Sequence, residues 1–295
     1  MANYMPEGTL ASVKKDAYDA LRSSYASVSR TISTEAAYTA KSQSACFDQF
    51  QLIEIPEVME KKMQAGVGAA LMRRWFASPK FVLPENWRAG DKDFLTVPSQ
   101  HLDTAIVKMD WVRRFTRANV AISTLERRLN TALALKELRR VLKRQHFLTN
   151  GKEKIGQAES AVVLHETSHL NSVAVAYGGG VDPLDCGLAA FTMHVAVSGT
   201  AEPLAGAMPN QKSHRISIER LNFYVRDSYD FNTEDEPLGY WGREGASASV
   251  FHVGMSYVEN RQFRLWRERH GRGGDFIIFS DVYQKNLPRP ILVEI

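Results

Sequence analysis

The spacing of apolar residues changes near the middle of this 295-residue chain, and this change limits the possible folds more than any other feature. Before residue 150, apolar side chains recur every three or four positions, as on one face of a helix. After residue 151 they alternate with polar ones, as in a strand with one buried face. The sequence therefore predicts an α+β fold. A helical N-terminal half would pack on a mostly antiparallel β C-terminal half, shaped as a partly open barrel or a sandwich.

Three parts are expected along the chain. Residues 1–50 are rich in Ser, Thr and Ala and contain few large apolar groups, which predicts a weakly ordered segment. Residues 51–150 predict a helical domain. One helix would run on from Pro56, and a second helical stretch would cover residues 104–145 with a break near 118–123. Residues 151–295 predict a β-rich domain that carries the chemistry.

The β-rich half shows three strand patterns and one helix. Residues 191–198 and 216–225 alternate apolar and polar side chains, and the second run changes parity at Glu219-Arg220, which predicts a β-bulge. Residues 276–282 are apolar on both faces, so this strand is expected at the centre of the sheet. Residues 259–270 have helical spacing, and Gly271 would end that helix.

Composition says more about the environment than about the activity. The net charge of +4 is mildly basic, and two cysteines, Cys46 and Cys186, provide no disulfide framework. No run of about 18 apolar residues is present, so no transmembrane segment is expected. The N-terminal residues lack the pattern of a signal peptide, and we expect a chain that is made in the cytoplasm.

One stretch is strongly basic. Between Arg113 and Arg144 there are ten Lys or Arg residues and two Glu residues. Such a run is typical of a solvated outer face, and the alternative is a docking surface for an acidic partner or for lipid headgroups. No aromatic residues form a stacking platform among these cations, so nucleic acid is not expected as a partner.

Residues 165–169 read His-Glu-Thr-Ser-His, the letter pattern of a zinc peptidase helix. On a helix, His165 and His169 would face the same way and bind Zn²⁺, and Glu166 would activate a water molecule. A helix over residues 157–177 would place them so, although β-branched residues and nearby strand patterns also permit a strand. The alternative is a pair of hydrogen-bonded histidines near a loop. A further zinc ligand could be Asp182, Asp185 or Glu202.

The run LNFYVRDSYDFN, residues 221–232, places a carboxylate where an apolar residue is expected. On a strand, Asp227 shares the core face with Phe223 and Val225, and a buried carboxylate is costly unless it is paired or bound to a cation. Asp230 lies at the strand end, where a turn could bring it beside Asp227. Together with Tyr229 they could hold a divalent cation, Mg²⁺ or Ca²⁺, and act as general acid and base. The alternative is a strand-end turn with a core tyrosine.

A second candidate site lies in the loop RHGRGGDF, residues 269–276. Its three glycines could expose backbone N–H groups, and His270 and Arg272 would surround them with positive charge, which suits a phosphate. An ordinary helix end followed by a turn is the alternative. Acidic groups for chemistry and cations for an anionic substrate are the composition of a phosphoester-cleaving site.

At these motifs the chain resembles a family of proteobacterial proteins found near type VI secretion and Rhs-type toxin loci. The resemblance is carried by DSYDFN (227–232), PLGYWG (237–242) and RHGRGGDFIIFSDV (269–282), and by LMRRWFASP (71–79) and MDWVRRFTRA (109–118). It implies an antibacterial effector carried by a type VI spike or tube component into the periplasm of a target cell. A cognate immunity protein would protect the producer.

The motif Asp-x-Tyr-Asp, here Asp227, Tyr229 and Asp230, is similar to the active site of the colicin M family. Those toxins cleave lipid II, the lipid-linked pyrophosphate precursor of peptidoglycan, and the similarity implies such an anionic lipid-linked substrate. In that family a His-Arg pair follows after five residues, where this chain has Glu236-Pro237. His270 and Arg272, or His214 and Arg215, would have to supply those groups.

Three functions therefore follow from the sequence. The leading hypothesis is a type VI-delivered hydrolase of a phosphoester or pyrophosphate in a cell-envelope precursor, with Asp227, Tyr229, Asp230, His270 and Arg272 as its catalytic residues. The second is a zinc peptidase toxin that uses His165, Glu166 and His169. The third is a non-catalytic, β-rich binding or adaptor module that accompanies a secreted toxin.

Overall fold

The computed structural model describes residues 50–148, 151–178, 182–205, 213–233, 236–247 and 254–295. Its helices are α2 (Ile55–Lys61), α3 (Gly66–Ala77), α4 (Glu85–Ala89), α5 (Met109–Val112), α6 (Thr116–Glu126), α7 (Ala132–Arg144), α8 (Ala161–Ser168), α9 (Pro183–Leu188) and α10 (Asn260–His270), with short 3-10 helices at Leu52–Glu54, Phe94–Thr96 and Ser99–His101. Its strands are β1 (Leu102–Asp103), β2 (Glu153–Ile155), β3 (His169–Val175), β4 (Phe191–Pro203), β5 (His214–Tyr229), β6 (Pro237–Gly242), β7 (Gly245–Ser247), β8 (Ser256–Glu259), β9 (Phe276–Phe279) and β10 (Tyr283–Glu294).

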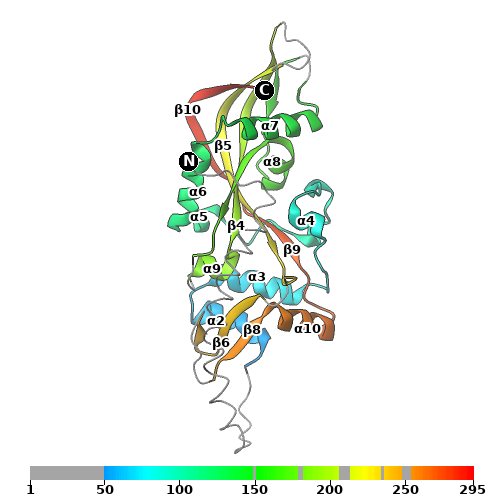
Figure 1. The fold of residues 1–295 in the computed structure, drawn as a ribbon, viewed down its shortest axis with the longest axis vertical. Coiled ribbons are helices and arrows are strands. Elements are labelled where there is room, and N and C mark those ends of the chain that lie inside the picture. Colours follow the sequence, from blue (N-terminus) through cyan, green and yellow to red (C-terminus); the bar gives the residue numbers. More distant parts are fainter. Residues whose placement is uncertain (1–49, 149–150, 179–181, 206–212, 234–235, 248–253) are drawn as a thin grey trace, which may run out of the picture.

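The predicted α+β class is confirmed, because most described helices precede residue 150 and most strands follow it (Figure 1). A large sheet curls into half a barrel, with the order β1-β9-β5-β4-β2; β10 also pairs with β5, and β3 pairs with β4. All of these pairs are antiparallel except β1 with β9. A second, three-stranded sheet has the order β7-β6-β8.

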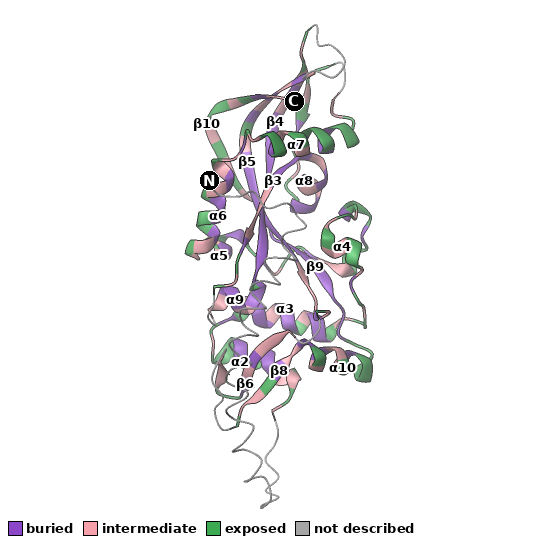
Figure 2. Ribbon diagram, viewed as in Figure 1, coloured by how far each residue is buried: buried purple, intermediate pink, exposed green. Residues whose placement is uncertain are grey.

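Strand β5 is the longest strand and organises the large sheet. It pairs with β4 along nearly its whole length, and on its other side it pairs first with β10 and then with β9. The predicted bulge is confirmed, because Arg220 lies opposite Ser198 and Ile218 lies opposite Gly199, which leaves Glu219 without a partner residue on β4. The central strands are buried (Figure 2).

The two faces of β5 pack into different cores. Phe223 and Val225 belong to the main hydrophobic core, which helices α5, α6 and α7 help to form beside the large sheet. Tyr224 points the other way, into a smaller core that it shares with Leu164 of α8 and Phe94. Because side chains alternate along a strand, Asp227 lies on the face of Phe223, as predicted, and Arg226 lies on the face of Tyr224.

The small sheet lies at one end of the molecule with α2, α3 and α10 (Figure 1). Trp75 of α3 is fully buried there among aromatic rings, and its indole N–H donates to Asp275, which also accepts from Arg267 at 2.6 Å. Gly68 allows α3 to approach α9, since a Cβ at that position would lie 2.7 Å from the carbonyl oxygen of Cys186. Helices of residues 51–150 therefore lie both here and beside the large sheet.

Helix boundaries in the N-terminal half differ from the prediction. The helix expected to run on from Pro56 is divided into α2 and α3 by residues 62–65, where Gln64 has a positive φ of 54°. The stretch over 104–145 does not break at 118–123, which lie inside α6. It breaks before Thr116 and again before Ala132, where Thr131 caps α7 with its side chain.

Two further expectations meet the structure here. The weakly ordered segment predicted for residues 1–50 falls almost wholly outside the described residues. The sequence predicts no transmembrane segment, and among the described helices none combines the length and the apolar character needed to cross a membrane.

Candidate metal centre

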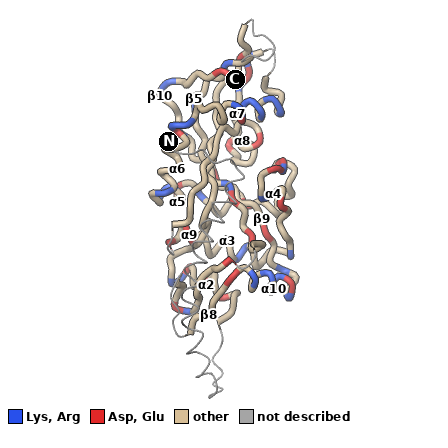
Figure 3. The backbone as a smooth tube through the Cα atoms, in the orientation of Figure 1, with Lys and Arg blue, Asp and Glu red and all other residues tan. Residues whose placement is uncertain are grey.

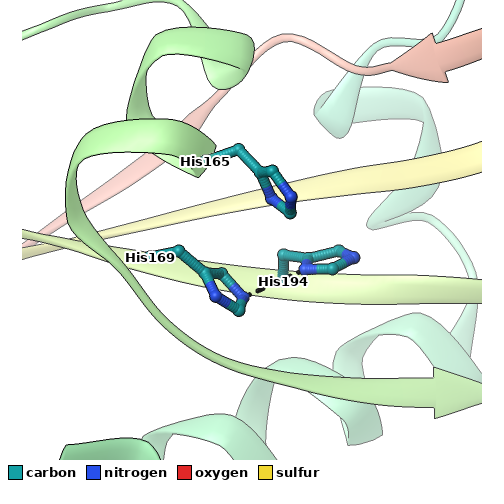
Figure 4. Close-up of side chains that lie close together, drawn as sticks. All are labelled: His165, His169 and His194. Atoms are coloured by element: carbon teal, nitrogen blue, oxygen red, sulfur yellow. Dashed lines mark hydrogen bonds between the residues drawn. The ribbon is translucent and has the colours of Figure 1, made fainter. Parts of the chain in front are cut away.

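The motif His-Glu-Thr-Ser-His spans the junction of a helix and a strand. Helix α8 ends at Ser168, and His169 takes an extended conformation as the first residue of β3. The predicted helix over 157–177 is therefore wrong beyond Ser168, because the β-branched residues that follow pair with β4 instead. The two histidines still converge, with ring centroids 5.1 Å apart (Figure 4).

A third histidine completes the cluster. His194 of β4 is fully buried, and its Nδ1 lies 3.1 Å from Nε2 of His169 (Figure 4). One ligand atom from each of His165, His169 and His194 lies within 4.8 Å of the others. In the alternating run 191–198, His194 falls on the more polar side with Thr192 and Ser198, and nothing in that run connects it with the motif. The connection depends on the pairing of β3 with β4, which alternation does not reveal.

Neighbouring polar groups orient two of the rings. Nδ1 of His165 lies 2.9 Å from the hydroxyl of Tyr224, and Nδ1 of His169 lies 3.4 Å from Oε1 of Glu137 on α7. Nε2 of His194 is buried and has no hydrogen-bond partner within the described residues. A carboxylate or hydroxyl on the far nitrogen of a histidine is the usual outer shell of a metal site.

The electrostatics favour neutral imidazoles. Burial lowers the pKa of both His165 and His194 well below the usual value, and the charges of His169 and Arg226 lower it further. Burial alone would raise the pKa of Glu137, but hydrogen bonds from Arg140 and His169 bring it down to about 2. The neutral ring is the form that binds a metal ion, so His165 and His194 have the protonation state that a ligand needs.

The cluster opens on a polar cavity of about 400 Å³. Its lining residues are Gly90, Asp91, Lys92, Glu137, Arg140, Arg144, His165, Glu166 and His169. Glu166 accepts a hydrogen bond from Arg144 at 2.5 Å and another from the backbone N–H of Phe94 at 3.2 Å. Burial raises the pKa of Glu166, although Arg144 and the Phe94 N–H act in the opposite direction.

The three acids that the sequence suggested as a further zinc ligand do not belong to the histidine cluster, and each forms an ion pair. Asp182 and Asp185 both accept from Arg117, and Glu202 lies 3.4 Å from Lys152. In the described parts of the chain, the group of His, Cys, Asp and Glu side chains suited to a metal ion contains the three histidines alone. A bound ion would therefore keep a position for water or substrate.

Asp227 and Asp230 line one cavity, and Asp227 lies on the face of β5 opposite to Tyr224. Asp227 is 7% exposed, and both carboxylates line a second cavity, of about 250 Å³, with Arg88 and Trp241. Oδ2 of Asp230 lies 3.4 Å from Nε of Arg88. Most of the other lining side chains are apolar.

Tyr229 lines the same cavity but does not hold the two acids in place through its hydroxyl. That hydroxyl donates to the sulfur of Met72 at 3.6 Å, and the ring stacks on Phe276. Burial raises the pKa of Tyr229. Its surroundings are those of a core tyrosine.

His270 and Arg272 are not brought to these acids. Both are exposed, the ring of His270 packs on Trp266, and neither residue lines the cavity of Asp227. His214 and Arg215 lie at the start of β5, about 40 Å along the strand from Asp227 at roughly 3.3 Å per residue. The His-Arg pair that the colicin M resemblance requires is therefore not assembled from either source.

The glycine loop does not form the predicted phosphate cradle. The N–H groups of Gly271, Gly273 and Gly274 donate to the backbone carbonyls of Arg267, Ser78 and Trp75. A Cβ on Gly274 would lie 2.3 Å from the carbonyl oxygen of Pro79, so this glycine permits close backbone packing. The ordinary helix end that the sequence also allowed is present, with Gly271 at φ 61°.

Comparison with known proteins gives one match. Residues 50–258 and 252–295 match the model of a family described as a family of unknown function, DUF6402. The chain belongs to the DUF6402 family. No curated protein and no solved structure matches it. The description of the DUF6402 family names no activity.

In chemical terms this member of the DUF6402 family presents three imidazoles beside a polar cavity. Three histidines with an open position are typical of a catalytic zinc site, whereas structural zinc sites have four protein ligands. Imidazole nitrogens suit Zn²⁺ and other transition-metal ions, while Mg²⁺ and Ca²⁺ prefer oxygen ligands. The histidine cluster and the Asp227 cavity would therefore bind different ions.

Proposed function

We propose that this chain is a zinc-dependent hydrolase whose metal ligands are His165, His169 and His194. The observation that carries the proposal is the convergence of three imidazoles, with ligand atoms within 4.8 Å of one another, beside a cavity of about 400 Å³. Nδ1 of His194 and Nε2 of His169, which face each other at 3.1 Å, support a shared ligand between these two rings.

Hydrolysis is proposed because three histidines would leave one coordination position of the metal ion open to water. A zinc ion held by His165, His169 and His194 would lower the pKa of bound water to about 7 and so supply a nucleophile at neutral pH. Glu166 is the candidate proton acceptor, because it lines the cavity and burial raises its pKa towards the range useful for general base catalysis. Arg144, which pairs with Glu166, would hold the carboxylate in position.

The test uses the full-length chain, stripped of metal and then loaded with zinc. Zinc-dependent hydrolysis of p-nitrophenyl acetate or p-nitrophenyl phosphate is expected, and His194→Ala should abolish both zinc binding and hydrolysis. Glu166→Gln should keep the zinc and lose about 100-fold or more in rate, as expected for a general base. A zinc-loaded chain that hydrolyses neither compound faster than free zinc would overturn the proposal.

The biological setting proposed for this hydrolase is that of an antibacterial effector delivered by a type VI apparatus. The motifs DSYDFN and RHGRGGDFIIFSDV support this setting through the resemblance described above. Expression in a Gram-negative host, with and without an export signal, should arrest growth only when the chain reaches the periplasm. Growth that is unimpaired in both compartments would favour the third hypothesis, a binding or adaptor module.

A second candidate function is phosphoester cleavage at the Asp227 cavity with Mg²⁺ or Ca²⁺. The specific observation in its favour is that Asp227 is only 7% exposed and shares a cavity with Asp230. The two functions separate cleanly in the periplasmic assay. If Asp227→Ala removes the toxicity and His194→Ala retains it, the second candidate replaces the first.

A further inference from the structure

The wall of the histidine cavity carries three Lys or Arg residues and three acids. Lys92, Arg140 and Arg144 line it, together with the acids Asp91, Glu137 and Glu166. Two of these acids are already engaged, because Glu137 accepts from Arg140 and Glu166 accepts from Arg144. A divalent ion bound to neutral imidazoles would add two positive charges, which makes the loaded cavity attractive to an anion.

Arg144 retains hydrogen-bonding capacity towards the cavity. Both of its hydrogen bonds, to the backbone oxygen and to Oε2 of Glu166, use Nη2, and the side chain is 41% exposed. An arginine has five N–H donors in a planar fork that suits phosphate oxygens. Nε and Nη1 are therefore available for a bound anion.

Lys92 is the second cation with capacity to spare. It is half-buried at the cavity wall, and its ammonium group has no hydrogen bond or ion pair to any residue in the described ranges. Lys92 lies three residues after α4, and Arg226 holds the end of that helix, since its Nη2 donates to the carbonyl oxygens of Trp87 at 2.8 Å and Arg88 at 3.2 Å. A lysine on an anchored loop has less conformational freedom to lose when it binds.

The approach to the cavity is also basic. Helix α7 carries Lys136, Arg139 and Lys143 on its exposed side, next to the two arginines that enter the cavity wall (Figure 3). These three residues form no ion pairs with residues that the structure describes. A face of this kind raises the local concentration of anions.

We infer that the cavity receives a phosphoryl group, held by Lys92 and Arg144 in front of the three histidines. This inference rests on the proposed zinc hydrolase and names its substrate class as a phosphate ester. A phosphoryl group has enough oxygens to contact a metal ion, a guanidinium and an ammonium together, whereas a carboxylate has only two. The volume of about 400 Å³ leaves room for the esterified part.

The test is calorimetric titration of the full-length chain with inorganic phosphate, with zinc loaded and with zinc removed. Lys92→Gln should weaken phosphate binding about 10-fold and Arg144→Gln about 10- to 100-fold, the usual effect of losing a charged hydrogen bond. Lys108→Gln and Arg269→Gln are matched controls, because both residues are exposed and lie outside the cavity and away from α7, and they should change binding less than about twofold.

Lys92→Gln decides the outcome if Arg144→Gln fails to fold, because Lys92 has no described contact to lose. Zinc binding without phosphate binding would overturn the inference and leave the proposed function standing. If the chain bound no zinc but bound phosphate in a way that depends on Lys92, the anion site would be supported and the proposed zinc hydrolase would be overturned. Equal affinity for acetate, or equal losses in the control variants, would overturn the phosphoryl assignment.

Discussion

Strand β5 presents two different sites on its two faces. Asp227 faces a cavity of about 250 Å³ whose walls are mostly apolar, and Tyr224, on the other face, touches a cluster of three histidines beside a polar cavity of about 400 Å³. The residue that stands out in the sequence is the buried acid, while the denser convergence of ligand atoms lies on the opposite side. One unusual residue therefore marks the strand that contacts both sites without marking the face that contacts the histidine cluster.

There is a physical reason why the sequence reveals the buried acid but not the histidine cluster. A carboxylate among apolar neighbours violates the alternation of a strand, so it is visible in one segment of sequence. The histidine cluster needs side chains from the end of α8, the start of β3 and the middle of β4, and each histidine fits its own segment without conflict. Such a site becomes visible only when the strands are paired.

The largest expected effect separates the two faces directly. His194→Ala should lower the affinity for zinc by more than about 100-fold, because even outer-shell changes cost 10- to 100-fold. Asp227→Ala should leave it unchanged, since Asp227 lies on the other face of the sheet. Zinc content of the purified variants measures both. If the Asp227→Ala protein lost its zinc and the His194→Ala protein kept it, the zinc site would lie on the Asp227 face instead.

A second prediction concerns Cys186, which lines the Asp227 cavity. Burial raises its pKa from 9.0 to about 12, and the carboxylates of Asp185 and Asp182 add to this effect. The reactive thiolate is therefore about 1000-fold scarcer at pH 8, below both pKa values, than in the unfolded chain.

Alkylation of native protein by iodoacetamide should be slower at Cys186 by a similar factor than in denatured protein. Peptide mass spectrometry distinguishes it from Cys46. Equal rates in native and denatured protein would show that this side of the sheet is open to solvent.

Tyr224 and Tyr229 lie on opposite faces of β5, so removing each hydroxyl in turn compares the effect of the two faces on zinc affinity. Tyr224→Phe removes the hydroxyl that contacts Nδ1 of His165 and should weaken zinc binding about 10- to 100-fold. Tyr229→Phe removes a hydroxyl bonded to Met72 on the opposite face and should leave zinc affinity unchanged. Competition with a chromogenic chelator measures both constants. Equal losses in the two variants would point to a general loss of stability.

The smallest expected effect is on thermal stability. Zinc at 100 times its dissociation constant should stabilise the chain by about 2.7 kcal/mol, which corresponds to a rise in Tm of roughly 5–10 °C. Differential scanning fluorimetry should detect the rise in wild-type and Asp227→Ala protein, and a chelator should reverse it. A rise that persists in His194→Ala would place the ion elsewhere.

Local patterns in the sequence predicted much of the fold. Alternation identified β4 and β5, and the change of parity at Glu219 located a bulge, because a single extra residue shifts every later side chain to the other face. Helix ends were predicted less well. Phe115 and Thr131 precede α6 and α7 in extended conformations, and these interruptions do not disturb the apolar spacing used to predict a continuous helix.

The candidate site was predicted only in part. His165 and His169 were recognised by their spacing, and the burial of Asp227 followed from strand parity. His194 was not grouped with them. It comes next to His169 only because β3 pairs with β4, and the sequence pattern does not reveal that pairing. The phosphate site predicted for the glycine loop was wrong because composition does not show which backbone groups are already bonded. The composition of this loop suits a phosphate, but its N–H groups donate to the backbone carbonyls of residues 75, 78 and 267.

X-ray absorption spectroscopy at the zinc edge tests the central claim most directly. For the zinc-loaded full-length chain, three imidazole nitrogens and one further light atom are expected, with nitrogen distances of about 2.0–2.1 Å. The imidazole signal should fall in His194→Ala protein and stay unchanged in Asp227→Ala protein. A first shell made of carboxylate oxygens, or one that is unaltered by His194→Ala, would contradict a metal centre built from His165, His169 and His194.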